Sequence, residues 1–593
     1  MLSRKNFFQY FAISAFGVSL IYILAGGISS LGEGQEYPYL MSGALLALLL
    51  LGWLLLNGGS GLIARLDPNR TLREAAWMNG AERTFAILVL MAAALLRIAM
   101  VRTMPMQVES DYRTYYEVAD LIARGTLRTE GPGYCDYISM FPHVYGFPFA
   151  LSLVFRIFGA SVNAALYFNV ALSVLTVFIC WRTARLAGGR LCGAVALLLT
   201  AFWPSQILYV NMVASEYLFS CMLMFAMYLF VRSIKDYTGE ARHPASGVLL
   251  HVLLGAWLAL TAAVRPMALL LVITIVICVC FERLRLPVRS TEDQPVSLII
   301  LSRGWMRCLI VIVAYASVSA MVSIGITNAV DRDLATGTTS FGYNLLVGLN
   351  TESEGGWNQQ DADYLYAALE ATNSAPEAQL ACRDLAVQRL GDVRGILNMF
   401  LRKFQVLWMN DDYGSTWNLL FMNQQGTLTE ARENFLYAAR SAGNFYYLLV
   451  VALAALEGIF LWRRGAGLAY PFVLMYLGTA AMHLLVENQN RYHFHALYML
   501  AILAAFGVRD ICAASRVRVQ QRQEEKRVLA RQRREDEMKK KVLQQEEAHL
   551  VELRQQAMQS GFDLRDALEK GYITVRVSEA YVDGKDGRQD SED

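Results

Sequence analysis

Four charged residues stand where long apolar runs of this sequence meet short polar segments: Asp111, Glu216, Arg265 and Arg491. A carboxylate beside a reacting carbon can take the proton from an attacking hydroxyl and so act as a general base. Arginine binds a phosphate through two parallel hydrogen bonds and stabilises charge that develops on it. If these side chains meet at one membrane face, they suit group transfer from a phosphate held at the level of the lipid headgroups.

Asp111 lies in VESDYRTYYEVADLIARG, residues 108–125, directly after an apolar run. An aspartate at a helix N-terminus complements the helix dipole, so Ser110 and Asp111 could simply cap the helix that follows. The third residue after Ser110 is Arg rather than Glu or Gln, so there is no capping box. The tyrosines of this stretch fit an aromatic belt at the membrane boundary. For Asp111, the cap and the functional carboxylate both stay open.

Glu216 and Arg265 also lie at predicted membrane boundaries. Glu216, in VASEYLFSCMLMFAMYLF, stands where an outer loop enters an apolar run, and a carboxylate there can also simply reach out to water. Arg265 interrupts VLLGAWLALTAAVRPMALLLVITIVICV, and an arginine at that depth is costly unless an anion pairs with it. Pro266 ends one predicted helix and opens the next, so helix N-terminal amides can face the same anion.

Arg491 repeats this pattern in HLLVENQNRYHFH, with Tyr492 beside it. Glu487 precedes Arg491 by four residues, the spacing of an ion pair on one helical face, so a purely structural pair is the alternative to anion binding. Two carboxylates and two arginines at one outer face suit a lipid-linked phosphosugar, whose polyprenyl tail would lie between apolar helices.

The composition indicates a membrane protein. The 593-residue chain is 55% hydrophobic and 18% charged, with a mean hydropathy of +0.33. Apolar windows of about 20 residues, enough to span a bilayer, recur along it, so we expect an all-α polytopic membrane protein. The net charge of +2 gives no indication of nucleic-acid binding. Nine cysteines lack metal-ligand spacing, and most fall in apolar runs, where packing is the default role. The first apolar run is too long for a signal peptide, which predicts an uncleaved span.

The positions of basic loops predict the orientation, because Lys and Arg concentrate on the cytoplasmic side. Placing every basic loop inside puts both termini in the cytoplasm and the four charged residues outside. The segment 141–159 is short and has two prolines, so we expect it to lie in the outer leaflet rather than span. About twelve transmembrane helices remain. They are predicted at 7–29, 38–57, 84–102, 162–182, 189–207, 214–233, 247–263, 267–282, 305–327, 444–462, 467–486 and 494–513.

The spans and loops divide the chain into five predicted parts. Within the outer insertion, 395–411 has the pattern of an amphipathic helix at the interface. The C-terminal tail has too few apolar heptad positions for a coiled coil and could bind a cytoplasmic partner. The parts are an N-terminal transmembrane hairpin with a basic cytoplasmic loop (1–83), a catalytic transmembrane module with its first outer loop at 103–161 (84–327), an extracytoplasmic insertion (328–443), C-terminal transmembrane helices (444–513) and a charged cytoplasmic helical tail (514–593).

Two stretches together resemble the C-type glycosyltransferases, or GT-C: SDYRTYYEVADLIARG, and the sequence that runs from FPHVYGFPFALSLVFRIFG to PSQILYVNMVASEYL. The similarity is to the branch of dolichyl-phosphate-mannose protein mannosyltransferases and aminoarabinose transferases. It covers residues 84–282, with a weaker match in ENQNRY at 487–492. The resemblance implies a GT-C-like helical bundle with outer juxtamembrane helices; the small extracytoplasmic insertion lies outside the shared module.

The resemblance also implies roles for single residues. Asp111 matches the acidic residue of the first outer loop that serves as base, and Glu216 matches the second acidic position. Arg265, in VRPMALLL, matches the cation that binds the donor phosphate. The family's Pro-Pro appears here as FPHVYGFP, a departure that leaves the role of His143 open. With Asp111 as the catalytic residue, the candidate substrate-binding residues are Glu216, Arg265, Arg491, Tyr492 and His143.

The sequence therefore predicts a glycosyltransferase that takes its sugar from a polyprenyl-phosphate donor, with undecaprenyl phosphate as the expected carrier. The acceptor hydroxyl can belong to a protein, a wall polymer or another lipid. A membrane transporter or lipid flippase is the alternative. Transporters typically show half-sequence repeats and ionisable residues near span centres, whereas no convincing repeat is found here and the candidate polar residues sit at the outer boundary. Two carboxylates could hold a divalent cation; no other cofactor is indicated, and no nucleic-acid partner is expected.

Overall fold

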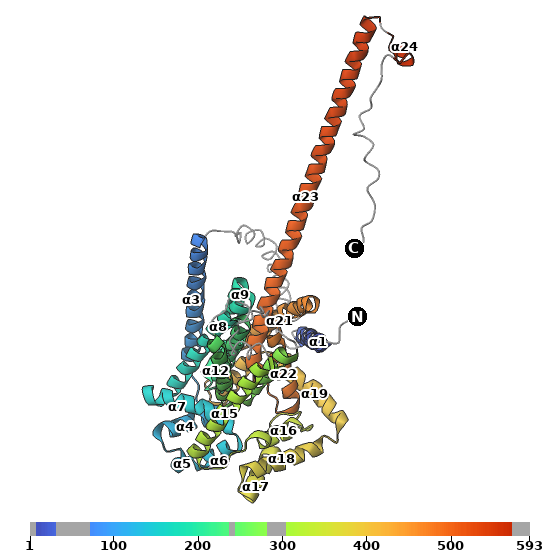
Figure 1. Ribbon diagram of the computed structural model, residues 1–593. Coiled ribbons are helices and arrows are strands. Elements are labelled where there is room, and N and C mark those ends of the chain that lie inside the picture. Colours follow the sequence, from blue (N-terminus) through green and yellow to red (C-terminus); the bar gives the residue numbers. More distant parts are fainter. Residues whose placement is uncertain are drawn as a thin grey trace. The chain divides into compact units, whose positions relative to one another are not determined.

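Every element of the described chain is a helix. The computed structural model describes residues 7–30, 72–236, 244–281, 304–465, 467–561 and 563–571, whose helices are drawn in Figure 1. The main apolar helices are α1 (Phe7–Ser30), α3 (Leu72–Thr103), α8 (Val162–Gly188), α9 (Arg190–Ala201), α11 (Ser215–Asp236), α12 (Pro244–Ala262), α13 (Leu269–Val276), α15 (Gly304–Val330), α21 (Glu430–Arg464), α22 (Tyr470–Leu485) and α23 (Phe494–Gln559).

Eleven of the predicted spans coincide with described helices. Seven helices are long and apolar enough to cross a membrane, and a further pair, Arg190–Ala201 with Pro204–Asn211, bends by 48° at a short break. Three shorter apolar helices match the rest: Gly247–Ala262, Pro266–Cys280 and Tyr470–Leu485. The predicted span at 38–57 lies outside the described residues. The prediction of an all-α protein with several membrane-spanning helices is therefore confirmed for the part of the chain that is described.

A layer of short helices connects α3 to α8: α4 (Ser110–Arg124), α5 (Leu127–Glu130), α6 (Pro132–Met140), η2 (Pro142–Tyr145) and α7 (Gly146–Phe158). Helix α7 has 13 residues, fewer than the ~20 that a bilayer crossing needs. Aromatic side chains pack α4 onto α7: the rings of Tyr115 and Phe147 lie 5.5 Å apart, and those of Tyr116 and Phe155 lie 5.2 Å apart. Tyr112 is buried in the main core, so the aromatic-belt interpretation is wrong for this residue.

The segment between α15 and α21 folds into η6 (Gly337–Thr339), α16 (Gly342–Gly348), α17 (Gln359–Thr372), α18 (Ala375–Arg389), α19 (Val393–Trp408) and α20 (Tyr413–Gln424). Helices α17 and α18 are joined by a buried ion pair of 2.6 Å between Asp361 and Arg389. The Asp361 carboxylate also accepts from the amide of Asn350 at 3.0 Å, which ties in the end of α16. The predicted amphipathic helix is present as α19, with exposed Leu397 and Leu401 along one side.

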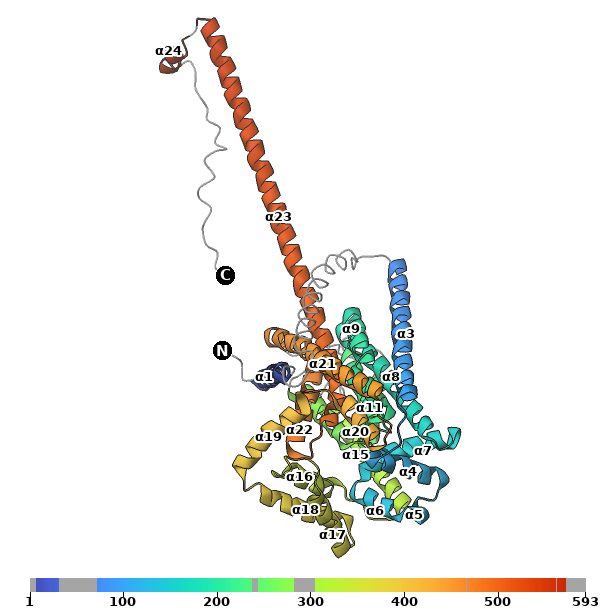
Figure 2. The same cartoon turned by 180° about the vertical axis from the view of Figure 1, so that it is seen from behind.

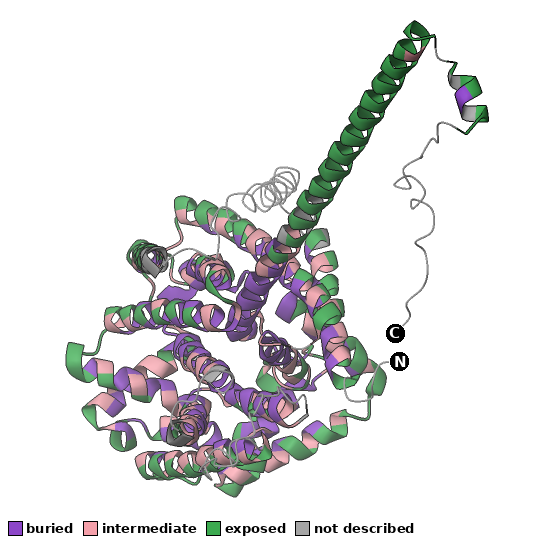
Figure 3. Ribbon diagram, turned by 45° about the horizontal axis from the view of Figure 1, so that its top comes forward, coloured by how far each residue is buried: buried purple, intermediate pink, exposed green. Residues whose placement is uncertain are grey.

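Helices α4–α7 and α16–α18 gather at one end of the bundle, as both views show (Figures 1 and 2). The chain divides into two compact units, residues 1–513 and residues 514–593. In the first unit, buried side chains concentrate where the apolar helices face one another (Figure 3). In the second unit, the remainder of α23 exposes nearly all of its side chains, and a short helix, α24 (Leu564–Glu569), follows it.

Candidate active site

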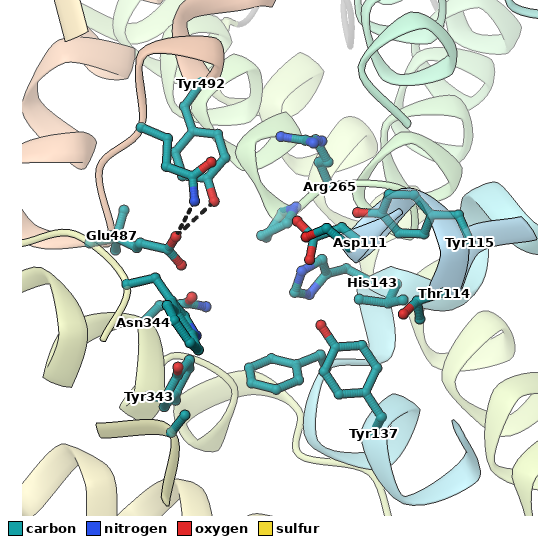
Figure 4. Close-up of a pocket in the computed structure, with 18 of the residues that line it drawn as sticks. Asp111, Thr114, Tyr115, Tyr137, His143, Arg265, Tyr343, Asn344, Glu487 and Tyr492 are labelled. Carbon is teal, nitrogen blue, oxygen red and sulfur yellow. Dashed lines mark hydrogen bonds between the residues drawn. The ribbon is translucent and has the colours of Figure 1, made fainter. Parts of the chain in front are cut away.

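A cavity of about 880 Å³ opens at the end of the bundle where α4 and α16 lie. Its walls come from α4, η2, the turn before α13, α16, α17 and the chain from the end of α22 to the start of α23. The charged groups face one another across it (Figure 4). Five of the six predicted site residues line this cavity: Asp111, His143, Arg265, Arg491 and Tyr492.

Asp111 forms an ion pair rather than a helix cap. Helix α4 begins after Glu109, with no capping hydrogen bond from a side chain, although Asp111 lies in the first turn, where its charge complements the helix dipole as the sequence suggested. The Oδ2 atom of Asp111 instead accepts from Nη2 of Arg491 at 2.6 Å. The Asp111 side chain is 50% exposed to the cavity, whereas that of Arg491 is 5% exposed. The second oxygen, Oδ1, has no hydrogen-bond partner among the described residues.

Aromatic rings enclose the guanidinium of Arg491. Its carbon Cζ lies 5.4 Å from the ring centre of Tyr112, 5.0 Å from that of Trp417 and 5.6 Å from that of Tyr492. Its Nη1 donates to the hydroxyl of Tyr112 at 2.6 Å, and its Nε is buried without a partner within the described chain. Such a cage holds a cation by cation–π attraction and keeps water away from it.

Glu487 is not the ion-pair partner of Arg491, contrary to the structural alternative that the sequence spacing suggested. Its Oε1 accepts from the hydroxyl of Tyr492 at 3.1 Å and from Nε2 of Gln489 at 2.9 Å. The four-residue rule holds only on a helix, and residues 486–489 form the irregular segment between α22 and η7 (Asn490–His493).

Glu216 lies behind Arg265 and does not line the cavity. Its Oε1 is 2.8 Å from Nη2 of Arg265, and the Glu216 side chain is 3% exposed. Ser215 accepts from Nε and Nη2 of the same guanidinium at 3.2 Å and 3.1 Å, which leaves Nη1 without a partner in the described chain. The expectation that Glu216 contacts substrate is therefore not met by its position: it holds Arg265 in place.

Two tyrosine hydroxyls connect the two ion pairs. The hydroxyls of Tyr112 and Tyr209 share a hydrogen bond of 2.7 Å, and Tyr209 donates to Oε1 of Glu216 at 3.4 Å. A continuous chain of contacts therefore runs from Asp111 through Arg491 and both tyrosines to Glu216, and from there to Arg265. Sequence reasoning missed Tyr209, because a tyrosine in the short outer stretch PSQILYVNMVASE carries no spacing signal of its own.

Two further titratable groups face the cavity from opposite sides (Figure 4). Burial, reinforced by the positive charge of Arg265, lowers the pKa of His143 to about 4, so this imidazole is neutral near pH 7. Burial raises the pKa of Glu487 above its usual value, although Tyr492 and Arg491 oppose the shift. His143 and Asp111 both line the cavity, and Glu487 lies beside Asn344, to whose carbonyl its backbone N–H donates.

A buried lysine fixes the segment that carries Glu487. The Nζ of Lys403, on α19, donates to the carbonyl oxygens of Gly348, Leu484 and Val486 at 2.8, 2.9 and 2.7 Å. The backbone N–H of Glu487 donates to the carbonyl of Asn344 at 3.2 Å. The ends of α16 and α22 are thereby joined, and the Glu487 side of the cavity is held as one piece.

The carboxylates do not fit a site for a divalent cation. Asp111 and Glu216 each pair with a separate arginine, and Glu216 lies outside the cavity wall. No group of three or more His, Cys, Asp or Glu side chains in the described ranges could hold a metal ion.

Comparison with known proteins gives one family match. Residues 143–305 match the family model for dolichyl-phosphate-mannose-protein mannosyltransferases. The sequence resemblance to these enzymes is confirmed over that stretch, which contains His143, Glu216 and Arg265 but neither Asp111 nor Arg491. No curated protein matches the chain.

Three solved structures have a similar helical arrangement. The oligosaccharyltransferase of Archaeoglobus fulgidus tethered to an acceptor peptide is 13% identical, with a TM-score of 0.39 over 71% of this chain and 49% of its own. The same enzyme in complex with an inhibitory peptide and a dolichol-phosphate is 13% identical, with a TM-score of 0.38. The match covers 72% of this chain and 50% of the archaeal chain. ArnT from Cupriavidus metallidurans bound to undecaprenyl phosphate is 13% identical, with a TM-score of 0.29. The match covers 71% of this chain and 77% of the ArnT chain. The chain spans about half the length of the archaeal enzyme.

Proposed function

We propose that this protein is a membrane glycosyltransferase, which moves a sugar from a polyprenyl-phosphate donor to an acceptor hydroxyl at the outer face of the membrane. One observation carries the proposal: in a single cavity, an unpartnered carboxylate oxygen of Asp111 faces the same space as the guanidinium groups of Arg265 and Arg491. The family match supports a lipid-phosphate donor, since dolichyl-phosphate-mannose stands in the description of that family.

The reaction has one bond made and one broken. The oxygen of the acceptor hydroxyl attacks the anomeric carbon of the donor sugar and forms the new glycosidic bond. The bond from that carbon to the phosphate oxygen breaks, and its electron pair stays on the phosphate. The hydroxyl proton moves to Oδ1 of Asp111, which acts as general base. The products are the glycosylated acceptor and polyprenyl phosphate.

The arginines stabilise the phosphate as negative charge develops on it. Arg265 presents an Nη1 group without a partner among the described residues, and its side chain is 18% exposed against 5% for that of Arg491. We therefore assign the first contact with the phosphate to Arg265. Arg491 acts from within its aromatic cage, where its ion pair with Asp111 also orients the general base. The neutral imidazole of His143 can donate or accept a hydrogen bond within the same cavity.

An outward-facing cavity agrees with the distribution of basic residues. The junction of α8 and α9 carries Arg182, Arg185 and Arg190, at the end of α8 remote from α7. Because basic loops face the cytoplasm, this end is proposed to be cytoplasmic and the cavity end extracytoplasmic. Both termini are then cytoplasmic in a bacterial plasma membrane, and the five predicted parts keep their proposed boundaries and sides.

The test is a transfer assay. Purified protein is incubated with radiolabelled polyprenyl-phosphate sugars and a membrane fraction, and the labelled products are identified. We expect label to move from the lipid to an acceptor. A lipid flippase is the alternative: it would bind the donor in the same cavity and move it across proteoliposome membranes without breaking the sugar–phosphate bond. Translocation of intact donor with no transfer to any fraction would replace the proposal with that alternative.

A further inference from the structure

The cavity wall opposite Asp111 is rich in aromatic side chains. Tyr343 lies in the first turn of α16, Trp357 lies in the loop before α17, and Tyr366 lies on α17; all three line the cavity. Trp357 and Tyr366 are 56% and 48% exposed, although Tyr343 is nearly buried. Phe141 extends the row, with its ring 5.6 Å from that of Tyr343. Exposed aromatic faces beside a cavity are typical of surfaces that bind a ligand.

Polar groups that lack protein partners lie among these rings. Oε2 of Glu487 has no hydrogen-bond partner within the described residues, and Oε1 of Gln489 is buried without one. The side-chain amide of Asn344 also lines the cavity and lies beside Glu487 (Figure 4). A buried polar atom without a partner is costly, so these groups indicate a ligand that supplies donors and acceptors.

This wall is pre-organised. Lys403 fixes the backbone on both sides of it, as described above. The loop with Trp357 is tied to the same segment, because the N–H of Asn488 donates to the carbonyl of Gly355 at 3.0 Å. A ligand therefore meets aromatic and polar groups that are already in position, which lowers the entropy lost on binding.

The charge of the wall differs from that of the opposite side. The arginines that line the cavity, Arg265 and Arg491, contact Glu216 and Asp111, and the rest of the described lining has no lysine or arginine. A phosphate has no cation to bind among Tyr343, Trp357 and Glu487. The wall suits a neutral ligand with flat apolar faces and many hydroxyl groups.

We infer that this wall is the acceptor subsite and that the acceptor is a carbohydrate, an inference that rests on the proposed glycosyltransferase function. The C–H face of a sugar ring packs on an aromatic ring such as Trp357. Adjacent sugar hydroxyls can donate to Glu487 and exchange hydrogen bonds with Asn344 and Gln489. The acceptor hydroxyl then points across the cavity to Asp111.

A polypeptide acceptor fits this wall less well. An extended peptide is commonly bound by adding a strand to a sheet edge, and the described elements around the cavity are all helices. A helical peptide needs a continuous apolar groove, whereas this wall also contains amide and carboxylate side chains.

The full chain in detergent can be titrated with neutral trisaccharides of mannose, glucose and N-acetylglucosamine, with a serine- and threonine-containing peptide, and with polyprenyl phosphate. Saturation-transfer NMR and calorimetry report the binding. We expect at least one trisaccharide to bind, Trp357→Ala and Glu487→Gln to weaken that binding at least tenfold, and Trp357→Phe to restore most of it. Affinity for polyprenyl phosphate should not change in these variants.

Matched controls are Trp305→Ala, which removes an equally exposed indole remote from the cavity, and Glu354→Gln, which removes an exposed carboxylate paired with Arg402. Both should bind trisaccharides as the unmodified chain does. The inference is overturned if no trisaccharide binds. It is also overturned if the peptide binds instead and Trp357→Ala abolishes that binding. Trisaccharide binding without polyprenyl-phosphate binding or transfer would retain the carbohydrate subsite and reject the proposed donor chemistry, so the two failures are distinct.

Discussion

The hydroxyl groups of Tyr112 and Tyr209 lie 2.7 Å apart, and this contact joins the two ion pairs of the cavity. On one side, Arg491 donates to Tyr112; on the other, Tyr209 donates to Glu216. Both tyrosines are buried, so the hydrogen bonds act in a medium of low dielectric constant, where they are strong and costly to break. The positions of Asp111 and Arg265, far apart in sequence, are thereby fixed relative to each other.

Asp111→Asn is expected to lower the transfer rate by about 100- to 10,000-fold, because an amide keeps the shape of the side chain and cannot accept the proton. The protein should remain folded, since the variant keeps a hydrogen-bond acceptor for Arg491. Asp120→Asn, on the same helix in an exposed pair with Arg124, is the matched control and should transfer normally. A normal rate for Asp111→Asn in the radiolabel assay would remove Asp111 as the base.

Arg265→Gln should have two separable effects. It leaves the buried Glu216 carboxylate without its cation, which costs about 3–5 kcal/mol of unfolding free energy. It also removes a charged donor to the lipid phosphate, a loss of about 1.5–3 kcal/mol in binding. Pairing it with Glu216→Gln should restore the thermal midpoint but leave lipid affinity low. If lipid affinity per folded molecule also recovers in the double variant, Arg265 is only a structural partner of Glu216.

Tyr112→Phe should destabilise the protein and lower the transfer rate, because it removes the acceptor for Arg491 and breaks the link to Tyr209. A hydrogen bond to a charged group contributes about 1.5–3 kcal/mol. Tyr209→Phe alone should do the same by breaking that link. Since both variants break one chain of contacts, the double variant should cost less than the sum. Thermal unfolding measures each variant, with Tyr116→Phe as control; strict additivity would mean that the two hydroxyls act independently.

The pKa of His143 predicts a pH dependence of stability. In the unfolded chain this imidazole takes up a proton below pH 6.5, whereas in the folded protein it does so only near pH 4. Between these values the unfolded state binds more protons, so stability should fall as the pH falls from 6.5 to 4, by on the order of 1–3 kcal/mol. His143→Asn should flatten this slope, measured by thermal midpoints across the window. His549→Asn, in the exposed tail, should leave it unchanged.

The proposed orientation predicts which residues can be labelled from outside the cell. Trp357→Cys should react with a membrane-impermeant thiol reagent in intact cells, because this position is exposed at the cavity. Lys540→Cys, in the tail, should react only after lysis. Native background should be low, since eight of the nine cysteines are buried and only Cys280 is partly exposed. Labelling of position 540 in intact cells would reverse the topology.

The membrane helices could be predicted from sequence because bilayer thickness imposes a length and polarity that any apolar window reveals. The pairing of the charged side chains could not be predicted from the sequence. Asp111 and Arg491 are 380 residues apart, and only the folded bundle brings them together. Local rules were misleading here: the helical spacing rule assigned Glu487 to Arg491, but the intervening chain is not a regular helix. The wall formed by α16 and α17 also carries no motif, because rings and amides line a cavity through tertiary packing alone.

The pairing of each arginine with a carboxylate makes the resting cavity selective. In the proposed orientation, the cavity lies at the depth of the phospholipid phosphates, which far outnumber any sugar carrier. Because the charges of Asp111 and Glu216 cancel those of Arg491 and Arg265, an ordinary headgroup meets little net attraction. Because only Nη1 of Arg265 is without a partner in the described chain, a phosphate that binds there makes few contacts, and a ligand needs contacts with other parts of the cavity to bind tightly. If the protein is the proposed glycosyltransferase, we expect this neutralisation of charge to keep the bulk phospholipids of the bilayer from competing with the donor for the site.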